Sequence, residues 1–204
     1  MGNFAKAVLN TDKNDKIPPR ARLLGAAGEL FYRHGIRAVG VEAIAEAAGT
    51  NKMTLYRHFS SKDELVAECL RRVAAKADAL WDRIAADHPD DPRVQLDGWV
   101  AAMAGHLASA DERGCAMCNA AVELPDRAHP ARGVIEAFKS DQRERLARLC
   151  AAAGAPQPEL LADELFLLVE GARVSLQSVG PEGPAARFAR MAEAMIARHV
   201  PAAA

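Results

Sequence analysis

The chain of 204 residues is poor in the residue types that favour β-sheet, and it has no long apolar run. Val, Ile and Thr together supply 22 residues, whereas Ala alone supplies 44. Ala loses no side-chain entropy in a helix, while β-branched residues lose χ1 freedom there. This balance predicts an all-α protein. No segment approaches the ~20 continuous apolar residues that cross a bilayer, so we expect no membrane partner.

Sequence motifs of catalysis and of metal binding are also missing. There is no Gly-rich phosphate loop, no nucleophile elbow and no HExxH motif. The six His residues show no spacing typical of a catalytic or metal site, and carboxylate pairs such as Asp90-Asp91 fit a loop. We therefore expect neither an enzyme nor a bound cofactor or metal.

Cysteine is scarce, and the N-terminal segment MGNFAKAVLNTDKNDK lacks the apolar core and the cleavage site of a signal peptide. We therefore expect a cytoplasmic protein. In that compartment the four cysteines, Cys69, Cys115, Cys118 and Cys150, are most simply reduced thiols.

The net charge of −1 hides an asymmetry along the chain. Residues 1–72 carry 12 Lys and Arg against 8 Asp and Glu, a balance of +4. Residues 73–204 carry 14 against 19, a balance of −5. A basic N-terminal part on an acidic body suggests that only the N-terminal part meets a polyanion.

Pro and Gly divide the chain into segments of helical periodicity, with no strand candidate. Residues 1–17 are polar and are expected to form a flexible arm. Asn51 can cap the third helix, and Ser60 or Ser61 can cap the fourth, with Asp63 or Glu64 completing a capping box. Nine helices are expected, at about 18–34, 41–48, 52–59, 62–87, 93–110, 114–123, 128–153, 158–178 and 184–199.

The third helix has almost nothing to bury. At 100° per residue Leu55 and Phe59 fall on one edge, while Met53, Tyr56 and Arg57 spread over the opposite arc. So short a helix is not stable alone and must be held by the two before it. A helix anchored by one edge can enter the major groove of DNA, where Arg or Lys donates to guanine and apolar groups touch thymine methyls.

Over about residues 20–70 the chain resembles the N-terminal DNA-binding domain of the TetR family of bacterial repressors, in the stretch LLGAAGELFYRHGIRAVGVEAIAEAAGTNKMTLYRHFSSKDELVAECL. The similarity includes the LF…HG end of the first helix, the I-A-x-x-A-G helix and turn, and TLYRHFSSKDEL. Thr50-Asn51 departs mildly from the pattern, in which a small apolar residue and Ser are commoner. The resemblance implies a helix-turn-helix whose recognition helix is residues 52–58.

We predict that double-stranded operator DNA is contacted from the recognition helix and its flanks. Lys52, Met53 and Arg57 are the expected base readers, and Tyr56, His58 and Lys62 are expected phosphate partners. The predicted DNA-binding residues are Thr50, Asn51, Lys52, Met53, Thr54, Tyr56, Arg57, His58 and Lys62.

The resemblance also implies a helical body that binds a small-molecule effector and dimerises through its last two long helices. The stripe of Phe188, Met191, Ala192, Met195 and His199 fits a homodimer interface, although such a stripe can also pack internally. Aromatic and Met side chains suggest an apolar or aromatic effector. The predicted ligand-binding residues, each of which can alternatively be a core residue, are Trp81, Trp99, Met103, His106, Cys118, Phe138, Gln142 and Phe166.

The segment Cys115-Ala116-Met117-Cys118 allows a redox pair or half a metal site, with His106 or His129 as further ligands. No second CxxC exists, and RGCAMCNAAVELPDRAHPA resembles a stretch found in one branch of the same family. We expect buried structural cysteines, with a thiol-based sensor as the alternative.

The sequence thus predicts three parts: an arm at 1–17, a helix-turn-helix domain at 18–60, and a ligand-binding and dimerisation domain at 61–204. The expected function is a ligand-responsive transcriptional repressor. A thiol sensor built on Cys115 and Cys118, and a helical interaction module without a DNA role, are the alternatives.

Overall fold

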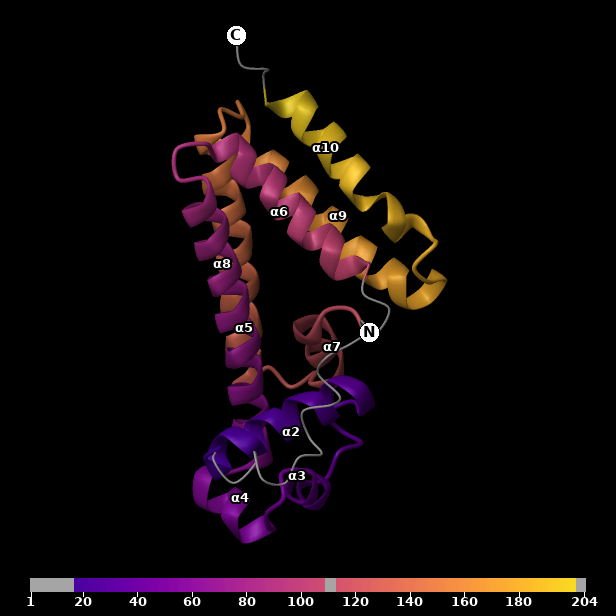
Figure 1. Cartoon of the computed structure of the whole chain (residues 1–204). Helices are drawn as coiled ribbons and strands as arrows, with labels where there is room; N and C mark the ends of the chain where they lie inside the picture. The colour runs from indigo at the N-terminus through magenta and orange to yellow at the C-terminus, as the bar shows by residue number, and fades with distance from the viewer. Residues whose placement is uncertain (1–16, 109–112, 201–204) are drawn as a thin grey trace. The chain divides into compact units, whose positions relative to one another are not determined.

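The computed structural model describes residues 17–108 and 113–200, which form α-helices with one short 3-10 helix and no strand (Figure 1). The predicted all-α class and nine α-helices are confirmed for this part of the chain. Residues 1–16 of the predicted arm lie outside it. The elements are α2 (Pro19–His34), α3 (Val41–Ala47), α4 (Lys52–His58), α5 (Lys62–Asp87), α6 (Pro92–Leu107), α7 (Ala116–Glu123), α8 (Pro130–Ala152), α9 (Pro158–Val179), η1 (Pro184–Arg187) and α10 (Phe188–His199).

Side-chain caps start the two helices that matter most for the site. Asn51 caps α4, because its Oδ1 accepts a hydrogen bond from the backbone N–H of Thr54 at 2.9 Å. Of the two serines that can precede α5, Ser61 is the cap: its Oγ accepts from the backbone N–H of Glu64 at 3.0 Å. The Glu64 carboxylate in turn accepts from the backbone N–H of Ser60. These caps satisfy N–H groups that a helix start leaves without partners.

The chain divides into two compact units, each assembled from two stretches of sequence. The first unit contains the described residues up to Val73 together with Ala116–Ile135. The second contains Ala74–Cys115 and the residues from Glu136 onward. Helices α5 and α8 each contribute residues to both units. The functional division predicted at residue 60 stays a prediction.

The core of the first unit joins the three short N-terminal helices to the start of α5. Helices α2, α3 and α4 contact one another. Fully buried apolar side chains come from each of them: Leu23 and Ala27 from α2, Ile44 from α3, Leu55 from α4, and Leu65 from α5. This burial holds α4, which is too short to be stable by its own hydrogen bonds.

The core of the second unit is built around Trp99. Its ring stacks on Trp81 and meets Phe188 edge to face, with both pairs of ring centroids 6.4 Å apart. Helices α6, α9 and α10, which contribute to this core, lie side by side (Figure 1). Over the described residues, no helix is long and apolar enough to cross a membrane.

Gly25 within α2 and Gly35 directly after it differ in backbone conformation and in the space around them. Gly35 ends the helix with φ 87° and ψ 154°, a backbone region essentially confined to glycine. A Cβ at this position would lie 3.1 Å from both carboxylate oxygens of Glu123. Gly25 is exposed in the middle of α2, and a Cβ there would meet nothing within 4 Å.

We expect Gly35→Ala to destabilise the protein by about 1–3 kcal/mol, because alanine avoids this backbone conformation. Gly25→Ala is the matched control and should stabilise it by about 0.5–1 kcal/mol, because glycine loses more conformational freedom in a helix. Urea unfolding followed by circular dichroism measures both changes, and an unchanged m value assigns them to stability. A Gly35→Ala variant as stable as Gly25→Ala would contradict the prediction.

Candidate nucleic-acid interface

Helix α4 is held by one edge and exposed on the other. Leu55 and the residue that ends the helix, Phe59, are buried, as the sequence predicts. On the opposite arc Met53 is 82% exposed and Tyr56 is 45% exposed. Lys52, Met53, Tyr56 and Arg57 line a wide and shallow surface depression. An exposed apolar side chain beside basic ones is the mixture that major-groove recognition uses.

The remaining predicted DNA-binding residues of this region serve the local backbone or stand at the surface. The Thr50 N–H donates to the carbonyl of Ala45 at 2.9 Å, which closes the turn after α3. Asn51 is the cap of α4, and the Thr54 hydroxyl accepts a hydrogen bond from Arg57 Nη2 at 3.2 Å. His58 is exposed at the end of the helix. Their contacts with DNA stay predictions.

Lys52 carries an ion pair. Its Nζ lies 2.7 Å from Oε1 of Glu42, in the first turn of α3. The hydrogen bond from Lys52 lowers the pKa of the Glu42 carboxyl, and the same bond raises the pKa of the Lys52 ammonium. Sequence reasoning named Lys52 but missed Glu42, because an exposed Glu ten positions away carries no signal of this pairing.

Lys62, a predicted phosphate partner, faces the protein. Its Nζ donates to the carbonyl of Ile36 at 2.6 Å and lies 5.9 Å from the centre of the Phe31 ring. The ammonium therefore stabilises the turn between α2 and α3. A phosphate contact from Lys62 stays a prediction, and it would have to share this ammonium with the turn.

The same turn is also held by Glu123, the last residue of α7. Its Oε2 accepts a hydrogen bond from the backbone N–H of Arg37 at 3.0 Å. Nearby, Nε2 of His129 lies 3.3 Å from Oδ1 of Asp63 at the start of α5. The α7–α8 segment thus contributes to the helix-turn-helix unit. Sequence reasoning missed this contact, because Glu123 lies 86 positions from Arg37.

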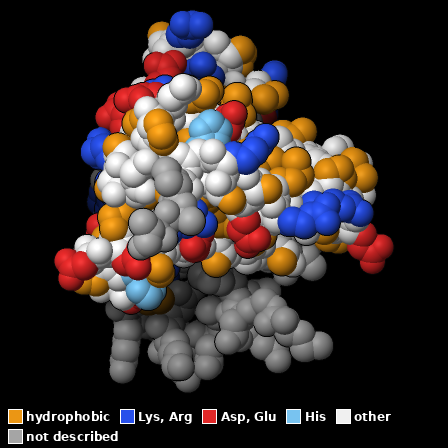
Figure 2. Space-filling model, turned by 90° about the horizontal axis from the view of Figure 1, so that it is seen from above, with side chains coloured by type: hydrophobic (Ala, Val, Ile, Leu, Met, Phe, Trp, Pro, Cys, Tyr) orange, Lys and Arg blue, Asp and Glu red, His pale blue; other side chains and the backbone are white. Residues whose placement is uncertain are grey.

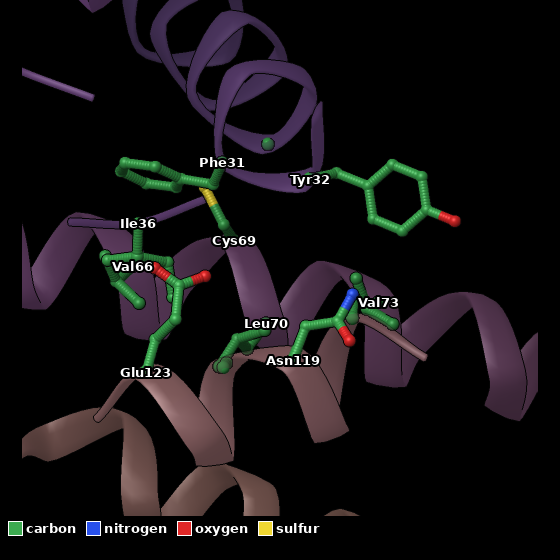
Figure 3. A pocket seen from close by; sticks show the side chains of 12 residues that line it. Phe31, Tyr32, Ile36, Val66, Cys69, Leu70, Val73, Asn119 and Glu123 are labelled. Carbon is green, nitrogen blue, oxygen red and sulfur yellow. The ribbon is translucent and has the colours of Figure 1, made fainter. Parts of the chain in front are cut away.

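A small cavity of about 50 Å³ lies where α2, α5 and α7 meet in the first unit (Figure 3). Phe31, Val66 and Leu70 give it apolar walls, while Asn119 and Glu123 point into it from α7. Ligand pockets usually measure about 300–1,000 Å³, so this space suits a few waters at most. None of the predicted ligand-binding residues lines it.

The predicted ligand-binding residues lie in different surroundings. In the second unit Trp81 Nε1 donates to Gln142 Oε1 at 2.8 Å, and Trp81 stacks on the buried Trp99. His106 is exposed. Cys118 is half-buried and belongs to the first unit, whereas the other seven residues belong to the second. Their role in binding an effector stays a prediction.

Phe138, Phe166 and Met103 lie beside charged groups that sequence reasoning missed. Lys139 Nζ is 5.9 Å from the Phe138 ring centre, 5.6 Å from the Phe166 ring centre and 2.6 Å from Glu170. Phe138 and Lys139 belong to α8, and Phe166 and Glu170 belong to α9. Glu170 also pairs with Arg173 at 2.7 Å, and Arg173 Nη2 lies 3.7 Å from Met103 Sδ.

The cysteines fall into two kinds. Cys69 and Cys150 are buried, and burial raises the pKa of each thiol to about 12. Cys115 and Cys118 are half-buried, so the prediction that they are buried is wrong. Cys115 precedes the first residue of α7, and its Sγ lies 3.5 Å from Lys139 Nζ, a polar neighbour that a closed apolar core would not provide.

Helices α3 and α4, joined by the turn Ala48–Asn51 and packed on α2, define a helix-turn-helix DNA-binding fold. The family model described as "Bacterial regulatory proteins, tetR family" matches residues 23–69. A TetR-family transcriptional regulator from Streptomyces coelicolor has a similar crystal structure, with 30% sequence identity and a TM-score of 0.84 over 90% of this chain and 96% of that one. The chain belongs to the TetR family of bacterial transcriptional regulators.

Two curated relatives match over less than a third of this chain. The transcriptional activator FasR of Mycolicibacterium smegmatis is 49% identical over 53 residues, and the transcriptional repressor KstR2 of Rhodococcus jostii is 45% identical over 60 residues. These matches take in 26% and 29% of this chain and 24% and 29% of those relatives, respectively. The family confirms the prediction that the chain is not an enzyme, and the comparisons give the thiol-sensor alternative no support.

We expect the buried thiols to resist alkylation. At pH 8 a thiol with a pKa of about 12 is ionised about once in 10⁴ molecules, against about one in four for an ordinary cysteine. Iodoacetamide labelling of the native protein, read by mass spectrometry, should therefore modify Cys115 before Cys69 or Cys150. Labelling in guanidinium is the control and should reach all four cysteines. Equal labelling of Cys69 and Cys115 in the native protein would refute this assignment.

Proposed function

We propose that the protein is a cytoplasmic transcriptional repressor that binds pseudo-palindromic operator DNA as a homodimer and is released by a small-molecule effector. The observation that carries the proposal is the exposed face of α4, a helix that the core holds by its buried edge alone. Membership of the TetR family supports the regulatory role.

The proposed docking places α4 in the major groove. Lys52 and Arg57 donate to guanine acceptors or phosphates, and Met53, which is 82% exposed, contacts a thymine methyl group. Tyr56 and His58 bind phosphates and fix the register of the helix in the groove. In a two-fold dimer the two recognition helices reach half-sites about one helical turn, roughly 34–36 Å, or a multiple of it apart.

The dimer is proposed to form through an exposed apolar stripe on α9. Leu160, Leu167 and Val174 are 46%, 69% and 63% exposed and recur every seven residues, which places them on one face of the helix. In the stripe predicted on α10, Phe188 and Ala192 are buried within the chain, as the alternative of internal packing expects, while Met191 is 44% exposed. Apolar side chains also reach the surface on the face shown in Figure 2, among groups of both charges.

Release by an effector is proposed to act through α5, which contributes to both units. An effector that binds more tightly to the conformation whose recognition helices do not fit the operator lowers operator affinity. The decrease is at most the ratio of the effector's affinities for the two conformations. An apolar or aromatic effector fits the aromatic residues of the second unit. Lys139 beside Phe166, together with Arg173 on the same Glu170 carboxylate, would additionally favour a polar or anionic group on it.

Binding to the DNA upstream of the protein's own gene tests the proposal. In titrations at two salt concentrations we expect selective binding over a scrambled duplex, with a steep salt dependence from released counterions. Arg57→Ala should weaken operator binding by about ten- to a hundred-fold, because it removes a contact in the groove.

Arg33→Ala is the matched control, because it removes the same charge from an exposed position on α2. It should change operator affinity far less than Arg57→Ala does. Equal effects of the two variants would show that only net charge matters, and would favour a helical module that binds DNA without reading it.

Introducing a charged side chain into the α9 stripe tests the proposed dimer. Val174→Glu places a carboxylate within the proposed symmetric interface, where the two copies of it would be buried without partners. We expect a shift from dimer to monomer in sedimentation equilibrium. Val122→Glu, on the 83% exposed Val122 of α7, is the control and should leave the dimer intact. A Val174→Glu protein that stays dimeric would exclude this stripe as the interface.

A further inference from the structure

Lys52 is the first residue of α4, and its ammonium is already occupied in the free protein. Its Nζ lies 2.7 Å from Oε1 of Glu42, which is the second residue of α3. Both side chains are at the surface, with 54% of Lys52 and 69% of Glu42 exposed. Both members of the pair are therefore accessible from solvent, and Lys52 also lines the surface depression that Met53, Tyr56 and Arg57 form.

The other predicted DNA-contacting cations have neutral partners among the described residues. Arg57 donates to the Thr54 hydroxyl, and Lys62 donates to the Ile36 carbonyl. A neutral acceptor leaves the positive charge of its donor uncompensated, and so available to a phosphate. Lys52 differs, because a full carboxylate charge cancels its own at hydrogen-bond distance.

Geometry makes this cancellation relevant to DNA binding. The N-terminal residues of a recognition helix reach base edges, while the helix before it crosses the phosphate backbone. Lys52 occupies the first of these positions and Glu42 the second. One of the three ammonium protons is donated to Glu42 Oε1, and the carboxylate charge offsets the attraction of the ammonium for a guanine or a phosphate oxygen.

Resting on the proposed function, we propose that Glu42 is an internal competitor for Lys52, a positioning residue that limits the affinity of the protein for DNA. In the free protein Glu42 holds Lys52. On the operator Lys52 exchanges the carboxylate for a DNA acceptor, and the lost ion pair is subtracted from the binding free energy. The ion pair is lost on every duplex that Lys52 contacts. Glu42 therefore lowers the affinity for all DNA sequences alike, and it favours dissociation of the protein from DNA.

The test is operator binding by Glu42→Gln, with Glu29→Gln as the matched control. Glu29 also carries an exposed ion pair, at 3.1 Å to Arg33, but it lies on α2. Each variant removes one negative charge from the same unit. Because exposed pairs are weak, we expect Glu42→Gln to tighten binding by about two- to five-fold, and by clearly more than Glu29→Gln.

A second pair of variants distinguishes competition for Lys52 from direct repulsion between the Glu42 carboxylate and DNA phosphates. In a Lys52→Gln background the gain from Glu42→Gln should fall to that of Glu29→Gln, because no ammonium remains to be released. A gain that persists in this background would overturn the proposal and assign repulsion instead. Equal gains from Glu42→Gln and Glu29→Gln in the wild-type background would also overturn it.

Failure of the proposed function gives a different pattern. A wild-type protein that binds operator and scrambled duplexes equally would refute selective reading. The difference between Glu42→Gln and Glu29→Gln on the scrambled duplex would still test the competition, because Lys52 can exchange Glu42 for a phosphate there. In the free protein, NMR titration of the Glu42 carboxyl should show its pKa rising when Lys52 is replaced by Gln, whether or not DNA is selected. An unchanged pKa would show that the ion pair is absent.

Discussion

The burial of Leu55 and Phe59 is the interaction on which the rest of the N-terminal unit depends. A helix of seven residues makes too few internal hydrogen bonds to persist alone, so these two side chains and the Asn51 cap must fix it. Once fixed by one edge, the helix can expose Lys52, Met53, Tyr56 and Arg57 without losing its place. The apolar anchor thus makes the polar reading surface possible.

Near this anchor, three positively charged side chains each donate to a different kind of acceptor. Lys62 meets a carbonyl oxygen, Arg57 a hydroxyl and Lys52 a carboxylate. The acceptor decides how much of the charge remains for a polyanion, because only the carboxylate neutralises it. Electrostatic attraction to DNA therefore depends on local pairing as well as on the basic balance of residues 1–72.

Local chemistry could be predicted from the sequence, and contacts between distant residues could not. The Asn51 cap and the bounds of α5 at Lys62 and Asp87 follow from side chains within one helical turn. Glu123 meets Arg37 only because folding brings α7 to the end of α2. Periodicity likewise identified an apolar stripe on α10, but it could not tell that Phe188 packs inside the chain.

The discontinuity of the N-terminal unit bears on how such regulators can be recombined. Residues 116–135 belong with the helix-turn-helix, although more than forty positions separate them from Val73. A chimera that joins the first 73 residues of this chain to another regulator's body would lose the partners that Glu123 gives to Arg37 and His129 gives to Asp63. Exchange of DNA specificity between such regulators therefore requires moving residues 116–135 together with the first 73 residues, or providing equivalent contacts in the recipient.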